Sequence, residues 1–207
     1  YNSIDSIDSQ NVIRLGLRNK LQTKRDGRVE NLVASDIYTD WRLADHHGQE
    51  AFSDLFSDCS FRPRSWLTLE SLTRWDMDDD RLNMAVHSLT FKPNDVWNWS
   101  IGHWYMRDGF MDDDGSSLIT DTFLWRLNEN WGLRAQHYFE ARTGTMQEQD
   151  YGIYRDLRSW TAAVTFRVRD NLGQANDYSV AFTFSLKAAP RFGLGSDTLR
   201  ANSLLGN

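Results

Sequence analysis

Histidines and aspartates are the side chains of this 207-residue chain that could bind a metal ion. The chain has five histidines, which are His46, His47, His87, His103 and His137. Zinc ligands usually recur at short, regular intervals, and these histidines share no such spacing. We therefore expect them to be surface or interfacial residues, and we predict no metal site.

An acidic run, Asp112-Asp113-Asp114-Gly115, resembles part of a calcium-binding loop. In the EF-hand pattern the first and twelfth positions carry acidic ligands, the twelfth being a bidentate glutamate. Here Phe110 and Asp121 fill those positions, so the pattern fails. We expect a solvated loop. A second interpretation, in which divalent ions bridge this loop to lipid phosphates, stays open if the loop lies outside a cell.

No catalytic set can be recognised, because no nucleophile, base and orienting group recur in a known arrangement. The lone cysteine, Cys59, cannot form a disulfide within the chain, and we expect a half-buried small residue or an idle thiol. The sequence therefore predicts no enzyme and no cofactor.

Composition excludes two further classes. The net charge of -6 and a pI near 5.3 argue against a nucleic-acid partner, whose phosphates call for a basic surface. No apolar run approaches the roughly 18 residues of a membrane helix, and the mean hydropathy is -0.60. The chain begins at Tyr1 without a leader sequence, so either a leader has been removed or, as we expect, the chain is a piece of a longer protein.

Alternation at every second residue is the strongest signal, and it is clearest at Tyr178–Lys187. Successive side chains of a strand point to opposite faces. One face of this segment is apolar, and its residues are Tyr178, Val180, Phe182, Phe184 and Leu186. The other face is small or polar, and its residues are Ser179, Ala181, Thr183, Ser185 and Lys187.

The same pattern predicts an all-β chain of about nine long strands, at 11–23, 29–43, 65–76, 81–92, 96–106, 118–127, 131–142, 154–169 and 178–187. Asp26-Gly27 predicts a tight hairpin turn between the first two. His46–Pro63 reads as a loop with a turn of helix at Ala51–Phe56, and a polar loop follows residue 142.

Strand length separates two architectures, a soluble sandwich and a membrane barrel. Soluble strands average about 5–6 residues, whereas strands that cross a membrane need about 9–11. Tryptophans also fall near the predicted strand ends, where membrane proteins place amphipathic rings: Trp41, Trp75, Trp125, Trp131 and Trp160. Both observations favour a transmembrane antiparallel β-barrel, of which this chain forms part.

The last third of the chain carries a more specific pattern. Trp125–Trp131 (WRLNENW) opens a hairpin whose return strand holds Tyr138, and Gly152-Ile153-Tyr154, Trp160 and the strand VAFTFSLK follow. The chain ends in RFGLGSDTLRANSLLGN, the most specific segment. From Thr122 onward this order resembles the C-terminal part of the LptD family of outer-membrane barrels.

The resemblance implies a location in the outer membrane of a Gram-negative bacterium and a role in the export and assembly of lipopolysaccharide (LPS). The resemblance also divides the chain into a barrel portion (1–189) and a C-terminal tail (190–207). It implies that the first barrel strand and a periplasmic jellyroll domain lie outside this chain. Implied partners are LPS, an LptE-like plug lipoprotein and periplasmic bridge proteins. LPS would leave between the first and last strands, and Tyr178–Lys187 would be that last, lateral-gate strand.

Polar inward residues would then line the route of the LPS head group: Arg14, Arg18, Asp36, Glu70, Arg134 and Arg167. An alternative for any one of these residues is that it keeps the lumen hydrated and does not contact the head group. Two other readings of the whole chain also stay open, a generic outer-membrane pore or transporter and a soluble β-rich binding domain.

Two features depart from the family pattern. Arg158 and Ser159 stand where the family usually has two adjacent cysteines, so disulfide-controlled maturation cannot be carried over. If the last strand descends to the periplasm, nine strands place the short turns at 93–95 and 128–130 outside the cell. Short turns belong on the periplasmic side, so we expect either a missed strand or genuinely short outer hairpins.

Overall fold

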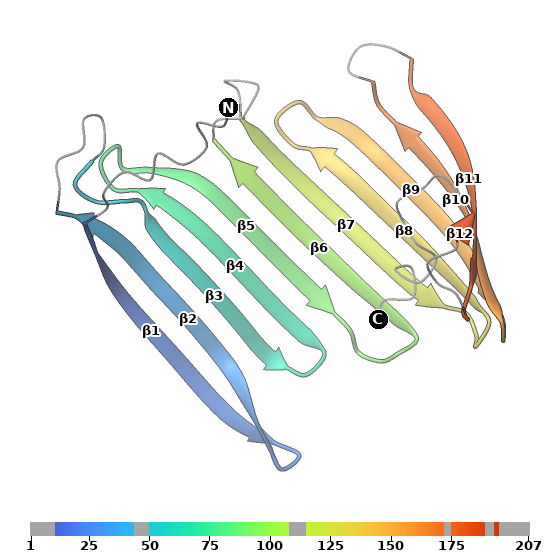
Figure 1. Cartoon of the computed structure of the whole chain (residues 1–207), viewed down its shortest axis with the longest axis horizontal. Coiled ribbons are helices and arrows are strands. Elements are labelled where there is room, and N and C mark those ends of the chain that lie inside the picture. Colours follow the sequence, from blue (N-terminus) through green and yellow to red (C-terminus); the bar gives the residue numbers. More distant parts are fainter. Residues whose placement is uncertain (1–10, 44–49, 108–114, 172–174, 189–192, 195–207) are drawn as a thin grey trace, which may run out of the picture.

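The computed structural model describes residues 11–43, 50–107, 115–171, 175–188 and 193–194, and these form one antiparallel sheet. Every strand pairs with its neighbours in chain order (Figure 1). The strands are β1 (Val12–Arg25), β2 (Arg28–Arg42), β3 (Leu55–Arg64), β4 (Leu67–Asp76), β5 (Arg81–Phe91), β6 (Trp97–Met106), β7 (Ser116–Arg126), β8 (Trp131–Glu140), β9 (Thr145–Asp156), β10 (Trp160–Arg169), β11 (Asp177–Leu186) and the short β12 (Gly193–Leu194). Within these described residues, no helix has the length and apolar character to cross a membrane.

The all-β architecture and the long strands are confirmed, and the sheet is open, as a partial barrel requires. The predicted hairpin turn between β1 and β2 is also confirmed. Asp26 and Gly27 have φ angles of 48° and 79°. Positive φ at both central residues is typical of a type I′ turn, whose twist matches that of the flanking strands.

The predicted count of nine strands is wrong, because two segments taken for loops are strands. β3 lies within the predicted loop His46–Pro63, and it pairs with β2 on one side and β4 on the other. β9 occupies the predicted polar loop, and the strand predicted at 154–169 is the end of β9, a turn and β10. Both missed strands carry polar residues on both faces, so alternation of apolar and polar residues is weak there.

The two added strands correct the assignment of the turns. The connections at 26–27, 65–66, 92–96, 127–130 and 157–159 all lie at one end of the sheet, here called the short-turn end (Figure 1). The connections at 43–54, 77–80, 107–115, 141–144 and 170–176 lie at the other, the long-loop end. If β11 descends to the periplasm, the turns at 93–95 and 128–130 are periplasmic. The earlier conflict therefore arose from the missed strand β9.

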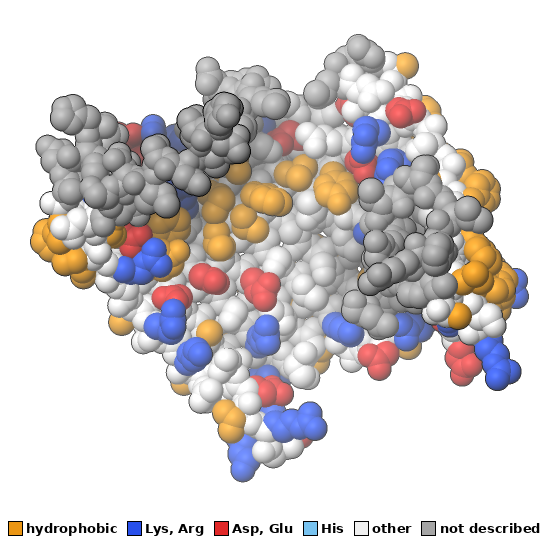
Figure 2. Space-filling view, in the orientation of Figure 1, with side chains coloured by type: hydrophobic (Ala, Val, Ile, Leu, Met, Phe, Trp, Pro, Cys, Tyr) orange, Lys and Arg blue, Asp and Glu red, His pale blue; other side chains and the backbone are white. Residues whose placement is uncertain are grey.

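The register gives the sheet two chemically different faces. Leu17 pairs with Ile37 and Val164 with Phe182 on one, called the apolar face. Arg18 pairs with Asp36 and Arg167 with Ser179 on the other, called the polar face. Figure 2 looks onto the polar face, where acidic and basic side chains gather over the first strands and a group of hydrophobic side chains lies nearer the long-loop end.

The apolar face has no second layer over it among the described residues. Phe182 is 70% exposed, whereas Ser185, on the polar face of the same strand, is only 8% exposed. The cluster of buried apolar residues consists of Tyr154 and Ala163. A soluble sandwich would bury its apolar side chains between two sheets, so this arrangement is that of a wall and not of a sandwich.

Candidate functional site

Ion pairs cross the polar face at both sides of the sheet. Between β1 and β2, Arg14 Nε lies 2.7 Å from Asp40 Oδ1, and Arg18 Nη2 lies 2.5 Å from Asp36 Oδ2. The Arg14 guanidinium also stands 4.4 Å from the centre of the Tyr38 ring. Each pair joins residues directly opposite each other in the register. The arginines are largely exposed, so the pairs fix side-chain orientation more than they stabilise the fold.

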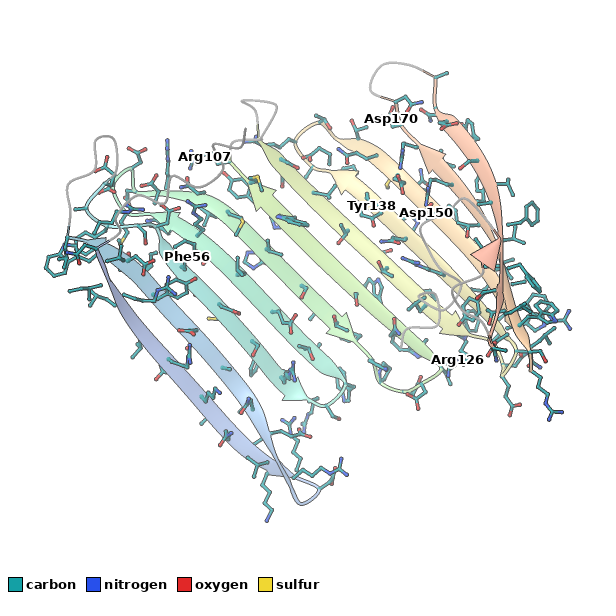
Figure 3. All side chains as sticks on the ribbon, in the orientation of Figure 1. Phe56, Arg107, Arg126, Tyr138, Asp150 and Asp170 are labelled. Atoms are coloured by element: carbon teal, nitrogen blue, oxygen red, sulfur yellow. The ribbon has the colours of Figure 1, made fainter. Side chains whose placement is uncertain are left out.

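The second group of charges joins β9 and β10 and is more enclosed. Arg167 Nε lies 2.7 Å from Asp150 Oδ1 and 3.3 Å from Glu148 Oε1, and Arg169 Nη2 lies 2.7 Å from Glu148 Oε2. Asp150 is only 4% exposed. Figure 3 labels Asp150 and Tyr138 on neighbouring strands of this part of the sheet. This group therefore holds β9 and β10 together while presenting charge to the polar face.

The six residues predicted to line a lumen all lie on the polar face, but they do not form one cluster. Arg18 and Asp36 are paired, and Arg134 donates a hydrogen bond to Gln136 two residues along β8. Glu70 Oε1 is 3.8 Å from Arg62 Nη2. Sequence reasoning missed Glu148 and Asp150, the partners of Arg167, because it placed them in a loop. The alternation of acids at 148 and 150 was the signal that could have revealed them.

The polar face also carries an exposed apolar patch at mid-sheet, toward the long-loop end (Figure 2). Leu72, Val86, Trp104 and Leu118 stand side by side in one row of the register across β4–β7. Trp104 is 51% exposed. We call these four residues the inner apolar patch. The only sign of the inner apolar patch in the sequence is at β5, whose two faces both carry apolar residues.

The predicted gate strand is β11, with Lys187 directly after its end. It pairs with β10 along its whole length. On its other edge, the described partner is β12, which pairs only with Phe184 and Ser185. The edge from Asp177 to Thr183 therefore has no strand beside it among the residues the structure describes. An edge of this kind can accept another strand.

Aromatic rings lie on the apolar face at both ends of the strands. At the short-turn end, Phe91 stacks between Trp66 and Trp99, with ring centroids 6.2 and 5.9 Å apart, and Trp160 packs on Phe184 at 5.2 Å. At the long-loop end, further contacts join Trp41 with Phe52 and Phe166 with Tyr178. The five tryptophans singled out in the sequence all lie on this face by register. Two aromatic girdles around an apolar band are typical of an outer-membrane barrel.

The three histidines that the structure describes do not come together as a metal site. His87 and His103 stack with centroids 6.0 Å apart, and His137 hydrogen-bonds to Asp121. Among the residues the structure describes, no group of three or more potential ligands gathers. His46, His47 and Asp112–Asp114 lie outside the described residues. Cys59 is a free, half-buried thiol 3.6 Å from the Ser57 hydroxyl.

Comparison with known proteins agrees with this geometry. The family described as LptD: LPS transport system D matches residues 1–131. The match thus covers the part of the chain upstream of the specific C-terminal pattern and overlaps it at 122–131. No curated protein matches the chain. Since the family match spans more than half of the sequence, the chain belongs to the LptD family.

Proposed function

We propose that this chain is the C-terminal wall of an outer-membrane barrel that carries LPS to the surface of a Gram-negative cell. The uncovered apolar face between two aromatic girdles is the observation that carries the proposal, because only a lipid bilayer satisfies such a surface on a single-layer sheet. Residues 1–189 form the wall and 190–207 the tail that follows it.

The connections support one orientation. Short turns belong to the periplasmic side and longer loops to the cell surface in outer-membrane barrels. The short-turn end is accordingly periplasmic, and the acidic connection at 107–115 lies at the surface. β11 then descends toward the periplasm as the last strand.

The polar face supports passage of a charged, hydrated head group. Ion pairs such as Arg18–Asp36 and Arg167–Asp150 place both signs of charge along the wall. The phosphates of a head group can replace the carboxylates as partners of the exposed guanidinium groups of β1, and sugar hydroxyls can donate hydrogen bonds to the carboxylates. No covalent bond forms or breaks in this exchange. Transport of the head group along such a surface needs no catalysis. The acyl chains of the same lipid move into the bilayer.

The inner apolar patch supports a protein inside the barrel. Leu72 and Trp104 are exposed on the face that also carries the ion pairs, and a lumen filled only with water would leave their apolar surface in contact with water. An LptE-like plug lipoprotein is the partner that fits there. Periplasmic bridge proteins would deliver LPS through a domain upstream of this chain.

The free edge of β11 supports a lateral gate. Its unpaired segment, Asp177–Thr183, is available to the first strand of the complete barrel. A short or incomplete ladder at that seam would open at lower cost than any other strand pair, because fewer backbone hydrogen bonds break.

A crosslink across the seam tests the proposal in the full-length protein. A cysteine at Ser179 is paired with cysteines scanned along the first barrel strand, and LPS at the cell surface is measured before and after reduction. Locking this seam should stop LPS export reversibly. A matched control joins Thr165 to Ala181, which already face each other across β10 and β11, and should leave export unchanged. Full export with the seam completely crosslinked would refute the gate.

A further inference from the structure

The apolar face is not equally apolar along the sheet. Toward the β11 side the apolar band runs the whole height of the strands, as in β10, where Trp160, Ala162, Val164, Phe166 and Val168 follow one another on this face. β11 continues the band with Tyr178, Val180, Phe182, Phe184 and Leu186. A full-height band of this kind matches an undisturbed hydrocarbon layer.

Over the central strands polar residues interrupt the apolar band, which Ile119 and Phe139 continue on β7 and β8. Ser71, His87 and His103 stand in one row of the register where aliphatic residues would be expected, and Asp121 pairs with His137 farther along. Ser117 lies beside them, next to the long-loop end of β7. We call these six residues the outer polar window. The next row toward the short-turn end is apolar on β4–β6, with Leu69, Leu89 and Ile101, and reaches Asp121 on β7.

Ionisable groups form the centre of the window. His137 Nδ1 lies 2.9 Å from Asp121 Oδ2, and His137 Nε2 lies 3.1 Å from the Tyr151 hydroxyl, which donates to Gln149 Oε1. Trp99 Nε1 donates to the second carboxylate oxygen. Asp121, His137, Tyr151 and Gln149 therefore form one connected set of hydrogen bonds across β7, β8 and β9.

Neighbouring groups of the window remain open to the surroundings. His103 Nε2 is 3.0 Å from Ser117 Oγ, and the ring of His87 stacks on His103 but is exposed. Cys59, Ser71, His87 and His103 also line a hollow of about 420 Å³, together with apolar residues of the same face such as Phe61, Leu69 and Ile101.

Such a surface is costly against continuous hydrocarbon, where ionisable side chains are rare and polar groups without water lose free energy. We propose that the bilayer is thinned beside β4–β8, so that water and lipid head groups of the leaflet on the long-loop side reach down to the outer polar window. The inference rests on the proposed membrane placement. The wall would then present lipids with two environments, full-thickness hydrocarbon at β10–β11 and a shallow, hydrated interface at its centre.

Spin labels on the full-length protein in phospholipid vesicles test this directly. Labels are attached to cysteines at Ser71 and, as a matched control, at Val164, which lies as far from the long-loop end of its strand, both in a Cys59→Ser background. Collision rates are measured with a water-soluble nickel complex and with oxygen, which concentrates in hydrocarbon. We expect several-fold more nickel collisions at Ser71 than at Val164.

Three results would overturn the inference, and they are distinguishable. Low nickel and high oxygen at both sites would mean continuous hydrocarbon over the window. Low rates for both reagents at Ser71 would mean that protein covers it. High nickel at Val164 as well would refute the membrane placement itself, and with it the proposed function.

Discussion

Tyr154 lies directly over Gly132, the residue opposite it on β8, and its ring fills the space where a side chain at Gly132 would stand. Tyr154 is one of the few buried apolar residues, with 5% of its surface exposed. The contact places a large ring against the sheet on the polar face, beside Ala163. Glycine is needed here for close approach and not for an unusual backbone angle.

Adding a methyl group at Gly132 should therefore destabilise the wall. In Gly132→Ala the ring of Tyr154 has to move, and overpacking of this kind costs about 1–3 kcal/mol. The measurement is the free energy of unfolding of the full-length protein in lipid vesicles, from urea titration. Gly152→Ala is the matched control, because its nearest neighbours would stand at 3.8 Å, an ordinary contact distance. Equal effects of the two substitutions would contradict the account.

The two groups of ion pairs should differ in their contribution to stability. Arg167→Gln leaves Asp150, which is almost fully buried, without its cation, and we expect a loss of about 2–4 kcal/mol. Arg14→Gln breaks an exposed pair and should change stability little. Urea unfolding of both variants compares them, and a larger loss for Arg14→Gln would show that the enclosed pair is not the stabilising one.

The sequence predicted those parts of the fold that depend only on residues close together in the chain. Asp26-Gly27 carries its turn type in two residues, and Tyr178–Lys187 shows its two faces without reference to any other strand. The apolar face and the tryptophans at its borders could be predicted for the same reason, since period-two alternation fixes which side chains share a face.

Strands whose two faces are both polar could not be predicted this way. In β3, Asp58 and Ser60 face the polar side while Ser57 and Cys59 face the other, and in β9 the run from Gln147 to Asp150 is polar throughout. The hydrogen-bonded set around Asp121 was beyond sequence reasoning as well. Its members come from β6, β7, β8 and β9, so they meet only once the register of each pair is fixed.

The assignment of faces predicts opposite outcomes for arginine at two exposed positions of β1. Leu17 lies on the apolar face near the middle of the strand, and Leu17→Arg should cost about 2–4 kcal/mol as expected for a cation facing hydrocarbon. Gln22→Arg lies on the polar face and should be tolerated. Folding in vesicles, followed by the gel shift between heated and unheated samples, measures both. Equal damage from the two substitutions would reverse or abolish the face assignment.

The Asp121–His137 pair predicts a non-additive pattern of stability. Removing one partner leaves the other polar group without this hydrogen bond on the apolar face, so Asp121→Leu and His137→Leu should each destabilise the protein, by about 1–3 kcal/mol. The double variant places two apolar side chains side by side across β7 and β8 and should recover most of that loss.

A double-mutant cycle of urea unfolding in vesicles measures the coupling between the two positions. Val164 and Phe182, also direct cross-strand partners on this face but without charge, provide the control pair, for which alanine substitutions should show little coupling. Additive losses at Asp121 and His137 would mean that the two side chains act independently and that their contact does not hold β7 to β8. Strong coupling with recovery in the double variant would show that the two side chains stabilise each other and are not required for the fold.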